Sequence, residues 1–158
     1  MQKILKVLIP ALLAALGLVM VPAAMANMGA EEANESIDPD YVAGKKALES
    51  QDWKKAIELL SKAMKTVSNN SEAHNLLGYA YRKTGNFEAS FAQYDQALKL
   101  DPANRHAHEY IGEAYLLTNN LPKAEQHLAE LQRLCSPIPC EEYKELKLAV
   151  DAYRKAKK

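Results

Sequence analysis

One spacing constrains this chain more than any other: Gly44, Gly78 and Gly112 follow one another at intervals of 34 residues. Four further columns keep the same step and hold, in order, bulky, small, large and apolar residues. They are Trp53, Phe87 and Leu121; Ala56, Ser90 and Ala124; Leu60, Tyr94 and Leu128; and Ala63, Ala97 and Leu131. Self-similarity at a fixed period is typical of proteins built from stacked supersecondary units. The sequence therefore predicts a repeat architecture.

Each unit reads as two amphipathic helices, because apolar residues recur at spacings of three and four. Side chains that can cap a helix N-terminus support this reading. The candidates are Asp38 (followed by Pro39), Asp52, Ser71, Asn86 and Asn120. Glycine and asparagine tolerate a left-handed backbone, so we expect helices to end at Gly85 and at the pairs Asn69–Asn70 and Asn119–Asn120.

The three aligned glycines need a physical reason, because a glycine inside a helix costs ~1 kcal/mol relative to alanine. Close approach of two helix backbones supplies one. We expect the glycines to face the small residues Ala56, Ser90 and Ala124 of the second helix, where a larger side chain would force the pair apart.

The repeat resembles the tetratricopeptide repeat, in which glycine is followed three residues later by an aromatic residue, then by a small residue and finally by proline. The aromatic residues here are Tyr81 and Tyr115, while the first copy has Ala47 instead. The match is best over residues 71–104, with Leu77, Gly78, Tyr81, Gly85, Phe87, Tyr94, Ala97 and Pro102 in place. The resemblance implies an all-α, right-handed α-solenoid.

About three such units are needed for independent stability, because one helix pair cannot bury both of its faces. The chain supplies three, at residues 37–70, 71–104 and 105–138. Residues 139–158 are predicted to form a capping helix over the open end. Its apolar stripe is Tyr143, Leu146, Val150 and Tyr153, and Lys144, Lys147, Arg154 and Lys155 are expected to face solvent.

Residues 1–26 form a separate segment. Lys3 and Lys6 precede an uncharged apolar run from Val7 that ends Ala24-Met25-Ala26. This pattern is typical of a secretory signal peptide and predicts cleavage after Ala26, with a periplasmic or secreted mature protein. A retained membrane anchor is the alternative, because ~20 apolar residues can span a bilayer.

A proline near the end of the run, Pro22, favours cleavage, because proline breaks a spanning helix. Residues 27–36 contain three glutamates and no apolar period, and are predicted to be a flexible leader. An acidic peptide-binding arm is the alternative for this segment.

Two cysteines, Cys135 and Cys140, enclose Ser-Pro-Ile-Pro at the junction with the capping helix. In an oxidising compartment we expect a structural disulfide, which contributes roughly 2 kcal/mol by closing a short loop. The pair also resembles one near the C-terminus of small exported bacterial tetratricopeptide proteins. A redox-active pair stays open as the alternative, because Cys140 stands near a predicted helix N-terminus, although thiol oxidoreductases usually separate their cysteines by two residues.

Catalytic and nucleic-acid functions find little support in the sequence. Twenty basic residues balance twenty acidic ones, so no net field favours nucleic acid. Phosphate-binding glycine loops, His-Glu-x-x-His and nucleophile elbows are all missing after residue 26. His106 and His108 point about 200° apart on a helix and cannot chelate together. His74 and His108 share a repeat position suited to interhelix packing, and His127 has no partner at a fixed spacing. We expect no enzyme, metal site or cofactor.

The first helices of stacked pairs line the inner surface of a solenoid, so we expect the functional residues there. The predicted groove residues, one turn around from the glycines, are Tyr41, Lys45 and Leu48; Asn75, Tyr79 and Arg82; and Glu109, Glu113 and Leu116. Tyrosine and arginine are favoured binding anchors. In the tetratricopeptide family such positions take an extended or helical peptide.

The chaperone-tail clamp of that family needs lysine and asparagine at positions that Tyr41 and Glu109 occupy here. Glu109 and Glu113 would repel a C-terminal carboxylate and suit a basic segment. The sequence predicts an exported, non-catalytic adaptor that binds a protein segment, for example within a cell-envelope assembly. A thiol-disulfide protein using Cys135 and Cys140, or a self-associating scaffold, are the alternatives.

Overall fold

The computed structural model describes residues 38–157. These residues all belong to one compact unit, Ser36–Lys158. The predicted signal peptide, residues 1–26, and the predicted leader, residues 27–36, lie outside the described residues.

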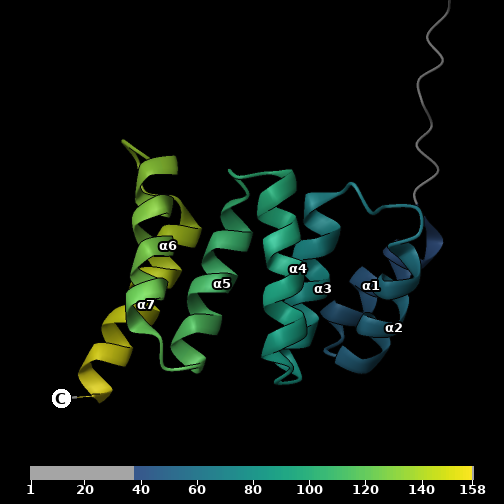
Figure 1. Cartoon of the computed structure of the whole chain (residues 1–158), viewed down its shortest axis with the longest axis horizontal. Coiled ribbons are helices and arrows are strands. Elements are labelled where there is room, and N and C mark those ends of the chain that lie inside the picture. Colours follow the sequence, from purple (N-terminus) through teal and green to yellow (C-terminus); the bar gives the residue numbers. More distant parts are fainter. Residues whose placement is uncertain (1–37, 158) are drawn as a thin grey trace, which may run out of the picture. The chain divides into compact units, whose positions relative to one another are not determined.

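The described residues contain seven helices and no strand (Figure 1). In chain order they are α1 (Pro39–Glu49), α2 (Trp53–Ala63), α3 (Ser71–Lys83), α4 (Phe87–Leu100), α5 (Arg105–Leu117), α6 (Leu121–Leu134) and α7 (Glu141–Ala156). The first six form the antiparallel pairs α1–α2, α3–α4 and α5–α6, within which the contacts are most extensive. The predicted all-α solenoid of helix pairs is confirmed. Over the described residues, the helices are all too short or too polar to cross a membrane.

An aspartate or asparagine caps each of the six paired helices, and its side chain accepts a hydrogen bond from the backbone N–H three residues later, at 2.9–3.3 Å. The caps are Asp38, Asp52, Asn70, Asn86, Asn104 and Asn120. The prediction that Ser71 is a cap was wrong. Its hydroxyl instead donates to the carbonyl of Ala97 (2.9 Å) and accepts from Asn104 Nδ2 (2.8 Å), which links the second and third pairs.

The turn inside each pair contains one residue with a left-handed backbone, at the same place in the 34-residue register. These residues are Gln51 (φ 58°), Gly85 (φ 78°) and Asn119 (φ 60°). Gly85 and Asn119 match the prediction, whereas Gln51 was not predicted because glutamine carries no such preference. Asn69–Asn70 does not end a helix: α2 ends at Ala63, and Asn70 begins α3 as its cap.

The helices lie in two layers. Helices α1, α3, α5 and α7 contact one another in succession, whereas, among the described elements, α2, α4 and α6 contact only helices of the first layer. Figure 1 shows the pairs side by side along the long axis of the unit. Helices that approach one another closely lie on the inside of a bend. The first helices and α7 therefore form the inner layer.

The aligned glycines are buried where helices cross. A Cβ atom added at Gly44 would lie 2.8 Å from the Leu60 side chain, and one at Gly78 would lie 2.7 Å from the Tyr94 ring and 3.2 Å from the carbonyl oxygen of Ser90. The expected close approach is present. The residues that cover the glycines were predicted only in part. Besides the small residues Ala56 and Ser90, the large side chains one turn later on the second helix, Leu60 and Tyr94, lie over Gly44 and Gly78.

The third glycine differs from the first two. A Cβ at Gly112 would lie 2.5 Å from Leu146, which belongs to α7 and not to the second helix of the same pair. Leu146 and Val150 are fully buried against α5 and α6, with Ala124 and Leu131 in the same cluster. Helix α7 therefore completes the packing of the third pair.

The loop between α6 and α7 holds both cysteines. In the structure a disulfide joins Cys135 and Cys140, whose α-carbons are 5.4 Å apart. Cys135 is buried and caps the C-terminus of α6, while Cys140 stands at the N-cap of α7. The cross-link thus connects the end of the last pair directly to the start of α7.

Candidate functional site

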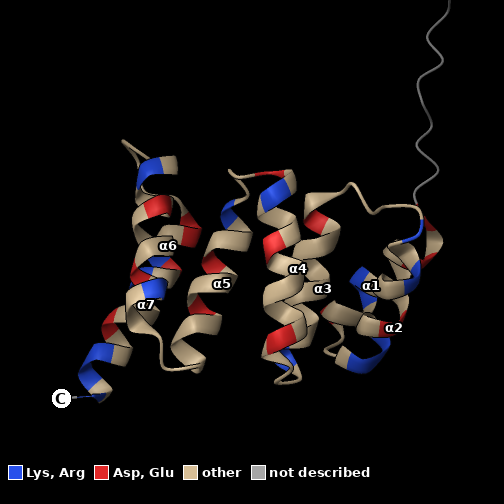
Figure 2. Ribbon diagram, in the orientation of Figure 1, with Lys and Arg blue, Asp and Glu red and all other residues tan. Residues whose placement is uncertain are grey.

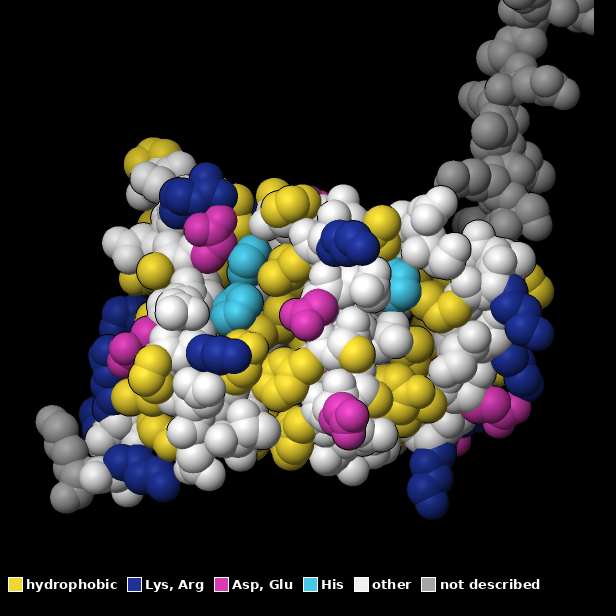
Figure 3. Space-filling model, viewed as in Figure 1, with side chains coloured by type: hydrophobic (Ala, Val, Ile, Leu, Met, Phe, Trp, Pro, Cys, Tyr) yellow, Lys and Arg dark blue, Asp and Glu magenta, His cyan; other side chains and the backbone are white. Residues whose placement is uncertain are grey.

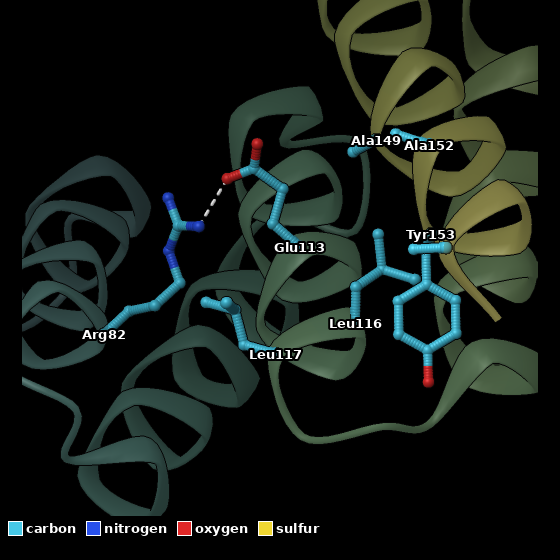
Figure 4. A pocket seen from close by; sticks show the side chains of 8 residues that line it. Arg82, Glu113, Leu116, Leu117, Ala149, Ala152 and Tyr153 are labelled. Carbon is cyan, nitrogen blue, oxygen red and sulfur yellow. Dashed lines mark ion pairs between the residues drawn. The ribbon is translucent and has the colours of Figure 1, made fainter.

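A cavity of about 440 Å³ opens in the inner layer between α3, α5 and α7 (Figure 4). We call it the inner cavity. Its lining comprises Arg82 of α3, Glu113, Leu116 and Leu117 of α5, and Ala149, Ala152, Tyr153 and Ala156 of α7. Figure 4 shows Arg82 and Glu113 pointing toward one another at one side, with Leu116 and Tyr153 at the other. The cavity therefore has one charged wall and one apolar wall.

The apolar wall follows from the sequence of α7. Ala149, Ala152 and Ala156 recur at spacings of three and four, so they share one helix face. Their small side chains leave the space that a larger residue would fill. Leu117 borders this space and is 58% exposed. The cavity thus offers apolar surface that the described residues leave uncovered.

The charged wall is an ion pair between the Arg82 guanidinium and the Glu113 carboxylate, which joins α3 to α5. The Arg82 side chain is only 9% exposed and lies against the rings of Tyr79 and Tyr110, at 5.1 and 5.3 Å from their centroids. Such cation–π contacts add to the ion pair in fixing the guanidinium. The wall is therefore preorganised and neutralised within the protein.

Glu109 lies one turn before Glu113 on α5 and is only 6% exposed. Burial, and then the nearby carboxylates of Glu113, Glu145 and Glu142, raise the pKa of Glu109 to about 8. Burial therefore favours the neutral form of Glu109. Because Glu113 is also paired with Arg82, the two carboxylates attract a basic segment less strongly than two free charges would.

The other predicted groove residues lie apart from the inner cavity. Tyr41 and Lys45 are on α1, with the Lys45 ammonium 5.6 Å from the centroid of the Tyr41 ring. Asn75 is fully buried and donates to Glu72 Oε2 at 3.2 Å. Tyr79 packs between Trp53 and Tyr110, with centroid distances of 5.9 and 4.9 Å. Leu48 packs against a small buried cluster that joins α1, α2 and α3.

Of the predicted groove residues, the structure therefore brings Arg82, Glu113 and Leu116 to the inner cavity. Sequence reasoning missed the contribution of α7, because it assigned Tyr153 to packing alone and did not consider the alanines. The spacing of Ala149, Ala152 and Ala156 was the available signal. Charge is mixed over the helices: Figure 2 shows lysine and arginine on α1 and α2 and again at the end of α7, and acidic residues on α5.

His74 and His108 lie between the helices of their pairs, as expected, where they meet Gln93 and His127. The contact between His108 and His127 was not foreseen: Nδ1 of His127 lies 3.0 Å from Nδ1 of His108 on the facing helix α5. Sequence spacing could not reveal this pair, because the two residues belong to different helices. Cys135, Cys140 and Glu142 also offer ligand atoms within 4.8 Å of one another, but sulfur atoms in a disulfide are not thiolate ligands.

Comparison with known proteins supports the repeat assignment. Residues 78–119 match the model of the TPR repeat family. A search of the curated proteins finds no match.

Solved structures share the fold at low identity. The Yersinia enterocolitica type III secretion chaperone SycD, in complex with a peptide of the translocator YopD, has a TM-score of 0.67 and 17% identity over 82% of this chain and 100% of that one. PcrH, in complex with the chaperone binding region of PopD, has a TM-score of 0.68 and 15% identity, over 78% of this chain and 95% of that one. The TPR2B domain of yeast Sti1, in a complex with pHsp70, has a TM-score of 0.68 and 15% identity, over 74% of this chain and 94% of that one.

Proposed function

We propose that this protein is an exported, non-catalytic adaptor that binds a segment of another protein along its inner layer. In this proposal one apolar side chain of that segment enters the inner cavity. The single observation that carries the proposal is the cavity itself, an apolar space bordered by the fixed Arg82–Glu113 pair. Pockets with apolar walls and a few placed polar groups are the usual form of a binding site.

The shape of the site favours an extended or helical segment over a small molecule. The cavity is one widening in a layer of four helices, and Tyr79 of α3 and Tyr110 of α5 continue that layer beyond it, with Trp53 at the start of α2 packed against Tyr79. Large, rigid aromatic side chains lose little conformational entropy when a partner binds. A segment anchored in the cavity can therefore gain further contact along these rings.

Three of the structural neighbours support this proposal by their bound partners. SycD was solved with a YopD peptide, PcrH with a region of PopD, and the Sti1 domain with pHsp70. The shared fold makes segment binding the first function to test here. The neighbours share only 15–17% identity with this chain, so their partners do not identify its partner.

Export is proposed from the sequence of residues 1–26, with cleavage after Ala26. The protein would then act in the periplasm or outside the cell, in an oxidising environment that maintains the Cys135–Cys140 disulfide. Mass determination of the protein recovered from the exported fraction tests this step. A mass that includes residues 1–26 would contradict cleavage and support the anchor.

The binding proposal is tested by filling the cavity. Ala152→Phe places a ring in the cavity, whereas Ala129→Phe makes the same change at a position of α6 outside it. Each protein is used to select from a phage-displayed library of short random peptides. We expect the native chain and Ala129→Phe to enrich peptides that share an apolar anchor, and Ala152→Phe to lose them.

Enrichment of the same peptides by Ala152→Phe would contradict the proposal, provided that the three proteins unfold at similar temperatures.

The two alternative functions predicted from the sequence have tests of their own. A buried Cys135 disfavours thiol–disulfide exchange, and a disulfide easily reduced by glutathione would instead favour the redox function. Light scattering on the mature protein tests self-association.

A further inference from the structure

A pair of histidines connects α5 to α6 on the side of the third helix pair away from the inner cavity. Figure 3 shows two histidine side chains next to each other over this part of the surface. The rings of His108 and His127 meet between α5 and α6, with centroids 5.2 Å apart and Nδ1 atoms 3.0 Å apart. His108 is 7% exposed, whereas His127 is partly open to solvent.

Hydrogen bonding orients the His108 ring. Its Nε2 lies 3.1 Å from the carbonyl oxygen of Pro102, which can only accept. A neutral His108 therefore carries its proton on Nε2 and turns the lone pair of Nδ1 toward His127. A carbonyl that holds the far nitrogen of a histidine is the usual support of a metal-ligating imidazole.

The second helix pair has the same arrangement with one change. Residues 34 positions earlier are His74 and Gln93, whose Nδ1 and Oε1 atoms are 2.8 Å apart. His74 Nε2 likewise lies 3.0 Å from a backbone carbonyl, that of Ser68. The third pair thus keeps an oriented histidine and replaces its amide partner with an imidazole. An imidazole is a far better ligand for a transition metal than a neutral amide.

We propose that His108 and His127 bind a divalent transition-metal ion of the copper or nickel type through their two Nδ1 atoms. At metal–nitrogen bonds of ~2.0–2.1 Å, a nitrogen separation of 3.0 Å corresponds to an angle of about 95° at the metal. Tetragonal copper(II) and nickel(II) sites place neighbouring ligands near this angle, whereas tetrahedral zinc needs a wider one.

Proton balance is simple in this site. Metal binding replaces the hydrogen bond between the two Nδ1 atoms. Each ring turns until its Nδ1 lone pair points at the metal instead of along the line between the nitrogens, and His127 moves its proton from Nδ1 to Nε2 and stays neutral. Among the described residues no third ligand meets this pair, and water would complete the coordination.

The test uses the mature chain without a histidine tag, titrated with Cu²⁺ in a calorimeter. His127→Gln reproduces the pair of the second repeat and is expected to weaken binding at this site at least tenfold. Gln93→His creates a second pair and is expected to add a second equivalent of bound Cu²⁺. His106→Gln, a change at an exposed histidine outside the pair, is the matched control. It should leave the affinity for Cu²⁺ and the number of bound Cu²⁺ ions unchanged.

Electron paramagnetic resonance of the Cu²⁺ complex supplies a direct readout, since two imidazole nitrogens split the signal in the native chain. Equal affinity of the native chain and His127→Gln, or a signal without two imidazoles, would overturn the proposal. Binding of Zn²⁺ more tightly than Ni²⁺ would overturn the assigned geometry. If His127→Gln fails to fold, imidazole nitrogen NMR shifts of the native chain with and without Ni²⁺ decide the question.

Discussion

The second and third helix pairs share a register but close in different ways. Gly78 is covered by Tyr94 of its own pair, whereas Gly112 is covered by Leu146 of α7. Leu128, which stands at the position of Tyr94, is only partly buried. A repeat sequence therefore specifies that a crossing is tight, while the neighbouring element decides which side chain fills it. The last pair of a solenoid depends on its cap.

The two pairs also differ in chemistry at matched positions. Asn75 and Glu109 are both buried at one such position, and Gln93 and His127 face the histidine of their own pair at another. The fold accepts either side chain at each place. Functional differences can therefore arise between repeats without any change in the helices.

The largest expected effect comes from removing the side chain that α7 contributes. Leu146→Ala should lower the free energy of unfolding by about 2–5 kcal/mol, because it leaves a cavity against Gly112. Leu128→Ala should cost less than half as much, because Leu128 is only partly buried. Urea unfolding measures both variants. Equal losses of stability would show that Leu128 supports the third pair as much as Leu146 does, as Tyr94 does within the second pair.

A pH-dependent effect should separate the third pair from the second. The pKa of Glu109 in the folded protein, about 8, exceeds its ordinary value of 4.5, so the folded state holds a proton that the unfolded state loses. This group therefore lowers the free energy of unfolding as pH rises from about 4.5 to 8, by at most about 1.4 kcal/mol per pH unit.

Replacing Glu109 with the residue of the second pair should remove that contribution. In urea unfolding at several pH values, Glu109→Asn should show a shallower decline with pH than the native chain. Glu88→Gln, at an exposed position of α4, is the control and should follow the native curve. An unchanged slope in Glu109→Asn would mean that Glu109 is already ionised in the folded protein.

Replacing the aligned glycines should change the free energy of unfolding less than Leu146→Ala does. Gly78→Ala should lower the free energy of unfolding by about 1–2 kcal/mol, because the new methyl meets a rigid ring and the Ser90 carbonyl. Gly112→Ala should cost a similar amount, because the new methyl would lie 2.5 Å from Leu146, which is fully buried and has little room to turn away. Thermal unfolding compares the two variants. A nearly neutral Gly112→Ala would show that Leu146 of α7 yields more easily than Tyr94.

The smallest effect concerns the caps. Asn70→Ala should cost about 1 kcal/mol, the usual value for a lost cap. Asn104→Ala should cost slightly more, because this side chain also donates to Ser71 in the preceding pair. Asn104→Asp keeps the cap and loses the donor, so its stability should fall between those of the native chain and Asn104→Ala. Identical values for both asparagines would exclude a role for the link.

Much of the fold could be predicted because its signals are local or periodic. The helix pairs, most of the caps, the left-handed turns at Gly85 and Asn119, and the apolar stripe of α7 follow from residues close together in the chain. The candidate site was less accessible. Arg82, Glu113 and Leu116 were expected on the inner layer, but the cavity needed the alanines of α7, and the pairing of Arg82 with Glu113 was not foreseen.

By itself the sequence determined the period, the helices, most of their caps and the faces that they bury, because these depend on neighbours within a few residues. Only the tertiary structure decided that Leu146 covers Gly112, that Arg82 neutralises Glu113, and that His108 meets His127. Each of these contacts joins different helices. Which side chains meet across such a crossing depends on how the helices pack, and no spacing along one helix encodes it.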